Sequence, residues 1–306
     1  MRTAAVVVDW RKPNETLAAL RSLSRMVPPP DTIVCVENES AAEQVRLLNA
    51  QAPSTVKFIE CAQNIGFAAA VNLGMKAALE DGAEWVLVLN NDALVMTNCL
   101  QRCIEYAISE GNAAAVGPAI AFMDSPERLW FGGGYVNSWL AFTRHRGLMQ
   151  PSSSPPPSGD TDFVTGCCML ISVAAWNQLG PFRADFFAYY EDAEWCQRAR
   201  AGGWRCLYVG EVLCVHAVSV SSEQRGSLGL SPNTAYYLGR NPVKFAIETK
   251  DAGRRLTRLL GLMIIWNAYN FWRLIQARNS ATAAAYVRGV VDAFRGRMGA
   301  AQFGQA

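Results

Sequence analysis

The sequence predicts an α/β protein in which a mostly parallel, doubly wound sheet is followed by a C-terminal helical region. Over residues 4–109, short apolar runs alternate with amphipathic segments, which is the pattern of strand–helix–strand units with short connections. The run at residues 85–89 is apolar throughout, as expected for a strand buried on both faces. We therefore expect an α/β domain over residues 1–235 and a helical region over residues 236–306.

Each element is placed from the spacing of its apolar residues and from the turn residues beside it. Strands are expected at residues 4–9, 32–36, 56–59, 85–90, 113–118, 162–166 and 212–215. Helices are expected after Asn14, which can cap the first of them, and at residues 41–49, 66–80, 98–109 and 186–201. The glycine-rich residues 131–135 are expected to form a hairpin turn, and the Ser- and Pro-rich residues 151–159 an exposed, mobile loop.

The C-terminal region is expected to be helical at residues 236–247 and 255–277. Asn267, Asn270 and Arg273 form one polar stripe along the second of these helices, so it is too polar to span a bilayer. Its basic flanks suit peripheral contact of residues 254–278 with anionic lipid on the inner face of the plasma membrane; they are Arg254, Arg255, Arg258 and Arg278. Packing against the α/β domain or a second subunit, which would give a homo-oligomer, is the alternative.

Composition and charge narrow the class of protein. The nine cysteines form no Cys-x-x-Cys motif, so they are interpreted as small buried hydrophobic residues in a reducing compartment. No secretory signal is found, and the protein is expected to be cytoplasmic. Residues 240–299 carry a charge of +8 and the remainder −6, which predicts an acidic body with a basic C-terminal region. No nucleic-acid partner is expected.

Polar residues follow four successive predicted strands: Asp9, Glu37, Asn64 and the Asn90–Asn91–Asp92 triplet. A single Asx cluster after a strand is usually a turn. In a parallel sheet, however, these four strand ends lie along one edge, where ligands of open α/β sheets bind. The sequence therefore predicts a ligand with several hydrogen-bonding groups.

The distribution of glycine discriminates among nucleotide-binding proteins. No glycine occurs before Gly66, whereas dinucleotide-binding and P-loop folds need glycines directly after the first strand. A diphosphate bound here would lack a cradle of backbone amides. A divalent cation held by Asp92 is the expected source of counter-charge.

Two further groups of residues can carry chemistry. Glu191, Asp192 and Glu194 place three carboxylates in four residues, which repel one another unless a helix N-terminus, water or a cation compensates. An exposed first turn of a helix would also explain them. Of the two histidines, His145 is expected at the surface, and His216 ends an apolar strand, where a structural role and a metal-binding role are both open.

Taken together, these motifs resemble the family 2 glycosyltransferases of the GT-A fold, particularly bacterial rhamnosyltransferase-like members. The resemblance runs from about Ala4 to His216, with a weaker match at Arg240 and Asn241. Its pieces are residues 64–74, which begin Asn-Ile-Gly-Phe and include Asn72, Leu-Asn-Asn-Asp at 89–92, Asp-Phe-Val-Thr-Gly at 162–166, Phe-Phe-Ala-Tyr-Tyr-Glu-Asp at 186–192, and His216. The triplet at residues 90–92 matches the family's Asp-x-Asp element, with Asn90 at the first position.

The resemblance implies a nucleoside-diphosphate sugar donor of the dTDP or UDP type. It assigns Asp9 and Glu37 to the base and ribose, and the residues lining the nucleoside and diphosphate would be Asn64, Gly66, Asn72, Asn90 and Asn91. The family has Asp where this chain has Glu37, and a Tyr-Asn-like pair in place of Asp9 and Trp10. The base therefore stays open.

The resemblance further implies an inverting transfer. Asp92 and His216 would hold Mn²⁺ or Mg²⁺, which screens the leaving diphosphate, and Asp192 would take the proton from the acceptor hydroxyl, with Glu191 on the acceptor side. Which of the two carboxylates is the base stays open. The sugar, rhamnose among the options, would pass to a surface glycan or to an acceptor on a polyprenyl diphosphate.

Two other functions remain as alternatives. A sugar nucleotidyltransferase is disfavoured because the chain lacks a glycine-rich loop after its first strand. A non-catalytic sugar-nucleotide-binding or scaffold protein is favoured by one feature, the neutral Asn90 in place of a carboxylate.

Overall fold

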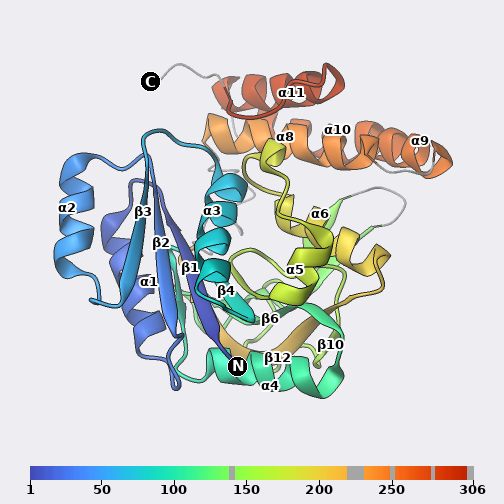
Figure 1. Cartoon of the computed structure of the whole chain (residues 1–306). Coiled ribbons are helices and arrows are strands. Elements are labelled where there is room, and N and C mark those ends of the chain that lie inside the picture. Colours follow the sequence, from blue (N-terminus) through green and yellow to red (C-terminus); the bar gives the residue numbers. More distant parts are fainter. Residues whose placement is uncertain (138–141, 219–230, 249–251, 277–279, 302–306) are drawn as a thin grey trace.

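The computed structural model describes residues 1–137, 142–218, 231–248, 252–276 and 280–301 (Figure 1). A central sheet runs through the molecule in the order β10-β12-β6-β11-β4-β1-β2-β3. Helices cover both faces, and helices from the C-terminal part of the chain lie at one end of the sheet (Figure 1). The predicted fold class is confirmed, and the details below concern what positions the site.

The first half of the sheet is parallel, as the sequence predicts. Its strands are β1 (Thr3–Asp9), β2 (Thr32–Asn38), β3 (Val56–Cys61) and β4 (Trp85–Asn90), and each neighbouring pair is parallel. The connecting helices are α1 (Pro13–Ser24), α2 (Ala42–Gln51) and α3 (Phe67–Glu80). Because β1, β2 and β4 align Asp9 with Glu37 and Val8 with Asn90, their carboxyl ends lie side by side.

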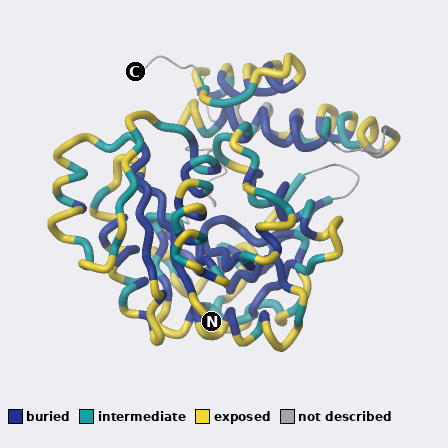
Figure 2. The backbone as a smooth tube through the Cα atoms, in the orientation of Figure 1, coloured by how far each residue is buried: buried dark blue, intermediate teal, exposed yellow. Residues whose placement is uncertain are grey.

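Helices α1 and α3 lie on opposite faces of this half of the sheet. Gly74 of α3 approaches Val6 so closely that a Cβ on Gly74 would lie 2.4 Å from the Val6 side chain. Asp9, three residues along β1, instead bonds to Thr16 of α1, as the alternation of side chains along a strand requires. The sheet between them is buried (Figure 2). Asn14 does not cap α1: Lys12 is the N-cap residue, and Pro13 opens the helix, where its missing N–H costs nothing.

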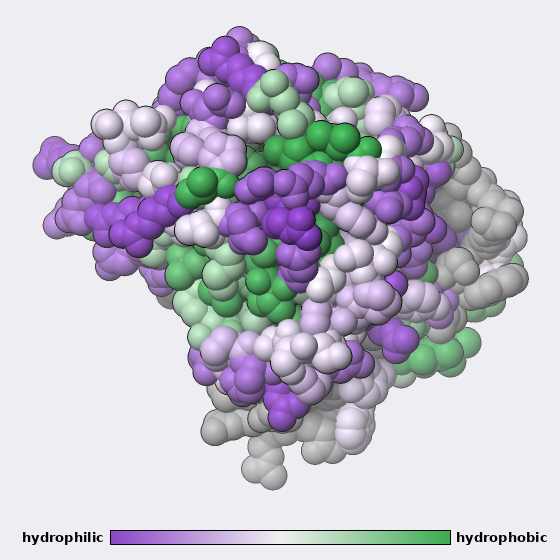
Figure 3. Space-filling model, turned by 90° about the horizontal axis from the view of Figure 1, so that it is seen from below, coloured by the Kyte–Doolittle hydropathy of each residue, from purple (hydrophilic) through white to green (hydrophobic). Residues whose placement is uncertain are grey.

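The second half of the sheet is mixed. Its elements are α4 (Cys99–Glu110), β5 (Ala93–Val95), β6 (Ala113–Phe122), β7 (Leu129–Phe131), β10 (Gly159–Asp160), β11 (Cys168–Ser172), α5 (Val173–Leu179), α6 (Glu191–Ala201) and β12 (Arg205–His216). β11 runs antiparallel to both β4 and β6, while β12 is parallel to β6. The side of the molecule seen from below in Figure 3 carries both hydrophilic and hydrophobic residues, with a hydrophobic area near its middle.

Three predicted elements differ from the structure. Residues 131–135 do not form a hairpin, because β7 pairs with β6 whereas β8 (Gly134–Val136) pairs with β9 (Thr143–His145) in a separate small sheet. Residues 162–166 contain no strand, and the sheet resumes at Cys168. The helical spacing of residues 186–190 does not correspond to a helix, because residues 187, 189 and 190 have positive φ; α6 begins at Glu191, where the Glu191–Asp192 pair predicts a helix start.

The C-terminal helices are α8 (Pro232–Ile247), α9 (Ala252–Gly261), the π-helical turn η2 (Leu262–Trp266), α10 (Asn267–Gln276) and α11 (Ser280–Phe294). α8 and α11 cross with their backbones almost in contact: a Cβ on Gly239 would lie 2.3 Å from the Tyr286 carbonyl oxygen, and one on Gly289 would lie 2.1 Å from that of Tyr236. None of the helices in the described ranges has the length and apolar character needed to cross a membrane. The division at residue 235 stays a prediction.

Two residues of the predicted polar stripe, Asn267 and Asn270, face inward. Asn267 and Asn270 are buried, the Asn267 carboxamide oxygen accepts a hydrogen bond of 2.7 Å from the Tyr286 hydroxyl, and Asn270 donates to the Trp266 carbonyl. The Arg254 and Arg273 side chains and all of Arg278 lie outside the described parts. The nine cysteines are all free thiols, and eight of them are buried.

Candidate active site

The Asp9 carboxylate anchors a hydrogen-bond network at the carboxyl end of β1. Its Oδ1 accepts a hydrogen bond of 2.5 Å from the Thr16 hydroxyl, and its Oδ2 accepts one of 2.7 Å from the Ser40 hydroxyl. Asn91 donates to the Thr16 hydroxyl oxygen over 3.1 Å. Asp9, predicted to contact the nucleotide, therefore also ties together the ends of β1, β2 and β4.

Glu37 lies beside this network in an unusual state. Its side chain is buried, and neither carboxylate oxygen has a hydrogen-bond partner in the described residues. Burial first, and then the charges of Glu60 and Asp9, raise the pKa of Glu37 to about 7. A buried carboxylate without a partner is costly, and such groups are candidates for ligand contact.

Asn38 and Asn64 join β2 to the start of α3. The Asn38 carboxamide donates to the Asn64 side-chain oxygen over 3.0 Å, and the Asn38 oxygen accepts from the Ile65 amide over 2.9 Å. The same Asn64 oxygen accepts from the Gly66 amide over 2.9 Å. Asn64 is thus held at the strand-end edge, where the sequence predicts it.

Asp92 and His216 come from different strands and meet at the same edge. Asp92 Oδ1 and His216 Nε2 are 3.0 Å apart, and the Lys12 ammonium lies 3.8 Å from Asp92 Oδ2. Burial raises the pKa of Asp92, but the hydrogen bond and charge of His216 and the charge of Lys12 outweigh it, so the pKa lies below its ordinary value. The other ring nitrogen of His216, Nδ1, is buried without a partner among the described residues.

This pair offers a carboxylate oxygen and an imidazole nitrogen, both of which Mn²⁺ accepts. Among the residues that the structure describes, no group of three or more acidic, His or Cys side chains is placed to hold a metal. The donor set therefore fits a cation that takes one or two protein ligands and completes its shell with phosphate oxygens and water, as is usual for Mg²⁺ in phosphate sites.

His145 is not a free surface residue, contrary to the expectation from sequence. Its ring lies 4.5 Å from that of Trp130 and 5.0 Å from that of Phe131, and burial lowers its pKa to about 4. Trp130 also lies 4.4 Å from the His216 ring, edge to face. Trp130, which sequence reasoning missed, thus fixes the plane of the His216 ring.

Glu191 and Asp192 begin α6 and differ in their surroundings. Asp192 Oδ2 accepts a hydrogen bond of 2.8 Å from the Gly166 amide, and its Oδ1 accepts one of 2.7 Å from the Ala193 amide. Burial raises the pKa of Asp192 despite these amides. Burial and the charge of Asp192 raise the pKa of Glu191 further, and its Oε2 is buried without a partner among the described side chains.

The Asp92 and Asp192 groups flank one short backbone segment, residues 166–167. The Asn90 amide at the end of β4 donates to the Cys167 carbonyl over 2.9 Å, and the adjacent Gly166 amide donates to Asp192 Oδ2 over 2.8 Å. The polar residues at the end of β4 and the start of α6 are therefore neighbours at one edge of the sheet.

The loop before α6, residues 185–190, has an uncommon backbone. Phe187 has φ 67° and ψ −64°, and the Ala188 amide donates to the Phe186 carbonyl over 2.9 Å, which together make a γ-turn of the rare, strained kind. Tyr189 and Tyr190 follow with φ of 68° and 74°. We call residues 185–190 the pre-α6 loop.

Gly66 packs against this loop, and its predicted contact with the donor stays a prediction. It has φ +88°, and a Cβ there would lie 2.7 Å from the Phe187 carbonyl oxygen. The Ala68 amide donates to that same oxygen over 3.2 Å. The start of α3 thus packs directly on the pre-α6 loop, which only glycine permits at this position.

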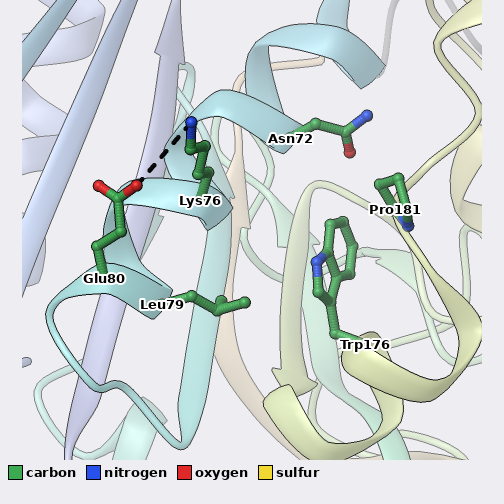
Figure 4. Close-up of a pocket in the computed structure, with 6 residues that line it drawn as sticks. All are labelled: Asn72, Lys76, Leu79, Glu80, Trp176 and Pro181. Atoms are coloured by element: carbon green, nitrogen blue, oxygen red, sulfur yellow. Dashed lines mark ion pairs between the residues drawn. The ribbon is translucent and has the colours of Figure 1, made fainter.

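Asn72 lies apart from the polar residues at the ends of β1, β2 and β4. Its carboxamide donates to the Phe182 carbonyl over 2.8 Å and accepts from the Phe182 amide over 3.1 Å. It lies on an open pocket between α3 and α5 that is also lined by Lys76, Leu79, Glu80, Trp176 and Pro181 (Figure 4). Asn72 fixes the loop ahead of the pre-α6 loop, and the nucleoside contact expected of it has no support from this geometry.

Comparison with known protein families identifies the family of this chain. The family model described as "Glycosyltransferase like family 2" matches residues 2–230. The chain belongs to this family. The match includes every residue that the sequence predicts for the site, from Asp9 to His216, and stops before α8.

Curated relatives of this family 2 member include glycosyltransferases from several organisms. The galactofuranosyltransferase GlfT1 of Mycobacterium tuberculosis is 32% identical over 133 residues, which is 42% of each chain, so this chain spans less than half the length of that relative. The N-acetylglucosaminyl-diphospho-decaprenol L-rhamnosyltransferase of the same organism is 26% identical, with 71% of this chain and 77% of that one covered. The dTDP-rhamnosyl transferase RfbF of Shigella flexneri is 24% identical over 61% of each chain.

Solved structures show the fold. The mannosyltransferase PcManGT from Pyrobaculum calidifontis, in complex with GDP-Man and Mn²⁺, has a TM-score of 0.59 at 16% identity and covers 96% of this chain and 87% of its own. GalNAc-T7 with UDP, GalNAc and Mn²⁺ also has a TM-score of 0.59, at 14% identity, over 94% of this chain and 52% of that one. The expectation of a GT-A-type glycosyltransferase fold is therefore confirmed.

Proposed function

We propose that this family 2 member is an inverting, metal-assisted glycosyltransferase that uses a nucleoside-diphosphate sugar of the dTDP or UDP type. Its acceptor is a surface glycan or a lipid-linked glycan. The observation that carries the proposal is that two groups adjoin the same backbone segment, residues 166–167: the end of β4, which leads into Asp92 and its partner His216, and Asp192 at the start of α6. Relatives named as rhamnosyl and galactofuranosyl transferases support it.

The donor's nucleoside would lie on the ends of β1 and β2. Within the described residues, both carboxylate oxygens of Glu37 lack a partner and can accept hydrogen bonds from base or ribose. Asp9, Asn64 and Asn91 keep that edge polar and ordered. The diphosphate would then lie toward Asn90 and Asp92. Asp92 and His216 would hold the divalent cation, which supplies positive charge to the departing diphosphate when bound.

Lys12 adds a counter-charge of the chain's own. Its ammonium lies 3.8 Å from Asp92 and belongs to the N-terminal end of α1, where the helix dipole also favours negative charge. Because Asn90 is neutral, the site has one carboxylate fewer than an Asp-x-Asp pair and would hold the cation more weakly. The positive charge of Lys12 would then supply part of the attraction for phosphate that the cation otherwise provides. This arrangement supports diphosphate binding even though the metal has few protein ligands.

Asp192 is the better candidate for the general base. Two backbone amides orient its carboxylate, and burial raises its pKa, which increases its affinity for a proton. Burial and the charge of Asp192 raise the pKa of Glu191, and its Oε2 has no partner among the described residues, which favours Glu191 as the member of the pair that carries a proton. A protonated Glu191 would donate a hydrogen bond to the acceptor, while Asp192 takes the proton from the attacking hydroxyl.

The test uses isosteric variants of both carboxylates. Asp192→Asn should bind nucleoside diphosphate like the parent, because its site lies at the strand ends, and should lose turnover by ~10²–10⁴-fold. Glu191→Gln should retain more turnover, because the amide still donates a hydrogen bond. Binding is measured by calorimetry with UDP and dTDP, and turnover by release of nucleoside diphosphate from the donor.

The outcomes separate the alternatives. If Glu191→Gln is the less active of the two with binding intact, the roles must be exchanged. If both variants release nucleoside diphosphate at the parent rate, neither is the base. If the parent itself binds donor and never releases the diphosphate, a sugar-nucleotide-binding scaffold replaces the enzyme.

We further propose that the C-terminal helices attach the protein to an anionic lipid surface. Leu256, Leu260, Ile264 and Trp272 each expose more than half of their surface, and we call these four the outer ridge. In an α-helix, each step of four residues turns the side-chain direction by about 40° around the helix axis. The π-helical turn η2 accommodates one extra residue within this run, which brings Ile264 and Trp272 back toward the line of the first two.

Charge selects lipid over a second copy of the chain. Residues 252–278 contain five arginines and no acidic residue; among those described, Arg255 is exposed and Arg258 lies over the Phe245 ring at 5.7 Å. A symmetric contact through this face would bring arginines together, whereas anionic headgroups would neutralise them. With Asn267 and Asn270 turned inward, the outer ridge has the apolar face of an interfacial helix.

Vesicle sedimentation tests this attachment. The parent should sediment with phosphatidylglycerol-containing vesicles more than with phosphatidylcholine alone, and salt should weaken the association. Leu260→Ser with Ile264→Ser should release it, whereas Ile108→Ser, an exposed apolar residue on α4, should not. Equal sedimentation of parent and ridge variant would refute the proposal, and a dimer that the ridge variant dissociates would assign the face to a second copy.

A further inference from the structure

The pre-α6 loop is hydrogen-bonded to α8, a helix more than 40 residues further along the chain. Arg240 and Asn241, in the middle of α8, are both completely buried. Arg240 Nη2 donates to the Phe186 carbonyl over 2.7 Å and to the Asp185 carbonyl over 3.2 Å. The Asn241 carboxamide nitrogen donates to the carbonyls of Phe186, Ala188 and Tyr189 over 3.1, 2.7 and 2.7 Å.

These bonds fall on the carbonyls of the strained turn. The Phe186 oxygen is the acceptor of the γ-turn and receives both Arg240 and Asn241 in addition. The left-handed Tyr189 and Tyr190 lie between the Asn241 contacts and the first residue of α6. A backbone in such conformations persists only when its surroundings over-determine it, and it is found where function needs the geometry.

Two more contacts join α8 to the pre-α6 loop. The rings of Phe187 and Tyr237 are stacked with centroids 5.1 Å apart and planes 9° from parallel. The buried Lys244 ammonium lies 2.7 Å from the Asp185 carboxylate and 4.8 Å from the Phe186 ring centroid. Arg240 itself is oriented by Asn241, whose side-chain oxygen accepts from Arg240 Nε over 2.9 Å.

We propose that Arg240 and Asn241 are positioning residues for the reaction: they hold the pre-α6 loop so that Asp192 starts α6 at the right place and in a water-poor environment. This inference rests on the proposed function of Asp192. It assigns the helical region a part in transfer, because the residues that shape the base's surroundings lie on α8. Neither residue contacts the polar residues at the ends of β1, β2 and β4, so donor binding does not depend on them.

The consequence for chemistry follows from geometry and burial. Without the Asn241 donor, the Phe186 carbonyl still accepts from Arg240 and from the Ala188 amide, whereas the Ala188 and Tyr189 carbonyls need another partner, and water is the available one. The turn would relax toward common backbone angles and shift the start of α6. A displacement of about 1 Å at a reacting group costs on the order of 10²-fold in rate, and entry of water brings a buried carboxyl's proton affinity toward its ordinary value.

Asn241→Asp is the sharpest variant, because it keeps the shape and removes the donor. The control is Val290→Ala in α11, which loosens the packing among Val243, Tyr286 and Ala293 without touching the pre-α6 loop. Both should melt at lower temperature than the parent. Only Asn241→Asp should lower kcat, by on the order of 10²-fold, with UDP affinity unchanged and the acidic limb of the pH–rate profile moved to lower pH. Arg240→Lys should fall between them.

The result that overturns the inference is an Asn241→Asp enzyme whose kcat and acidic limb match those of Val290→Ala. Loss of UDP binding in Asn241→Asp also overturns it, because the residue would then support the whole site. A parent that neither binds UDP or dTDP nor releases nucleoside diphosphate would instead remove the proposed function, which the parent measurement detects independently of any variant.

Discussion

Replacing Glu37 with Gln should stabilise the protein without ligand and weaken nucleotide binding at the same time. Glu37 is buried with both carboxylate oxygens unpartnered among the described residues, and its pKa is raised to about 7 from an ordinary value of 4.5. Each unit of pKa shift corresponds to about 1.4 kcal/mol. The ionised carboxylate therefore costs the folded protein up to ~3 kcal/mol. We expect Gln to recover ~1–2 kcal/mol, because water screens the exposed Glu60 and the new amide also lacks ideal partners.

The pH dependence fixes the origin of this effect. A carboxyl whose pKa is raised by folding binds its proton more tightly in the native state, so the parent loses stability as pH rises from 4.5 to about 7. Gln does not titrate. The two proteins should therefore melt together near pH 4.5, separate as pH rises to about 7, and keep a constant gap above it. The gap should be a few degrees for a chain of this size.

Melting curves between pH 4.5 and 8.5 measure the stability, and titration with UDP or dTDP measures the binding. Glu60→Gln is the matched control, because Glu60 is the cross-strand neighbour of Glu37 on β3 but is exposed. It should give a smaller gain and leave nucleotide affinity unchanged. A gap that is the same at every pH, or a Glu37→Gln protein that binds nucleotide as tightly as the parent, would refute this reasoning.

Two other predictions concern the ends of the site. Gly66→Ala should destabilise the fold and lower turnover, because its Cβ would meet the Phe187 carbonyl oxygen at 2.7 Å, whereas Gly82→Ala, with a similar φ of +78° and nothing within 4 Å, should cost only backbone strain; equal melting temperatures for the two variants would contradict this. Asp92→Ala should remove the part of nucleoside-diphosphate affinity that depends on Mn²⁺ and leave the affinity in EDTA nearly unchanged; equal losses under both conditions, measured by calorimetry, would argue against a metal at Asp92.

The sheet could be predicted from sequence because its information is local. The runs that form β1, β2 and β4 are apolar and end in polar residues, and that pattern alone places Asp9, Glu37 and Asn90 on one edge. The close packing of Asp92 against His216 needed one more step, since β12 reaches the same edge from the far half of the sheet. The family resemblance supplied that step.

The pre-α6 loop could not be predicted because distant residues determine its backbone. Phe187 and Tyr190 have a spacing typical of the helix that follows, yet both adopt positive φ. Arg240 bonds to the carbonyl before Phe187, and Asn241 bonds to the carbonyls of residues 188 and 189. The contacts of Asn72 were unpredictable for a similar reason, since both of its amide atoms bond to Phe182, 110 residues away; its assignment to the nucleoside stays a prediction. Hydrogen bonds between such distant residues leave no periodic signal in either segment.

The helix at residues 252–276 shows a further limit of pattern reasoning. The sequence left open whether its polar stripe or its apolar residues meet protein; in the structure Asn267 faces the Tyr286 hydroxyl of α11 and the outer ridge faces out. Amphipathic spacing gives the two faces of a helix and not which of them meets protein. The outward direction of the outer ridge is the reason to expect a lipid partner.

The most direct test of the central claim is calorimetric titration of UDP and dTDP into the full chain, in Mn²⁺ and again in EDTA. If Asp92 and His216 hold a cation beneath the diphosphate, one of the two nucleotides should bind at least tenfold more tightly with Mn²⁺, and Lys12 should leave measurable affinity in EDTA. Equal affinity under both conditions would contradict the metal-assisted site. Absence of binding by both nucleotides would contradict a donor site at this edge of the sheet.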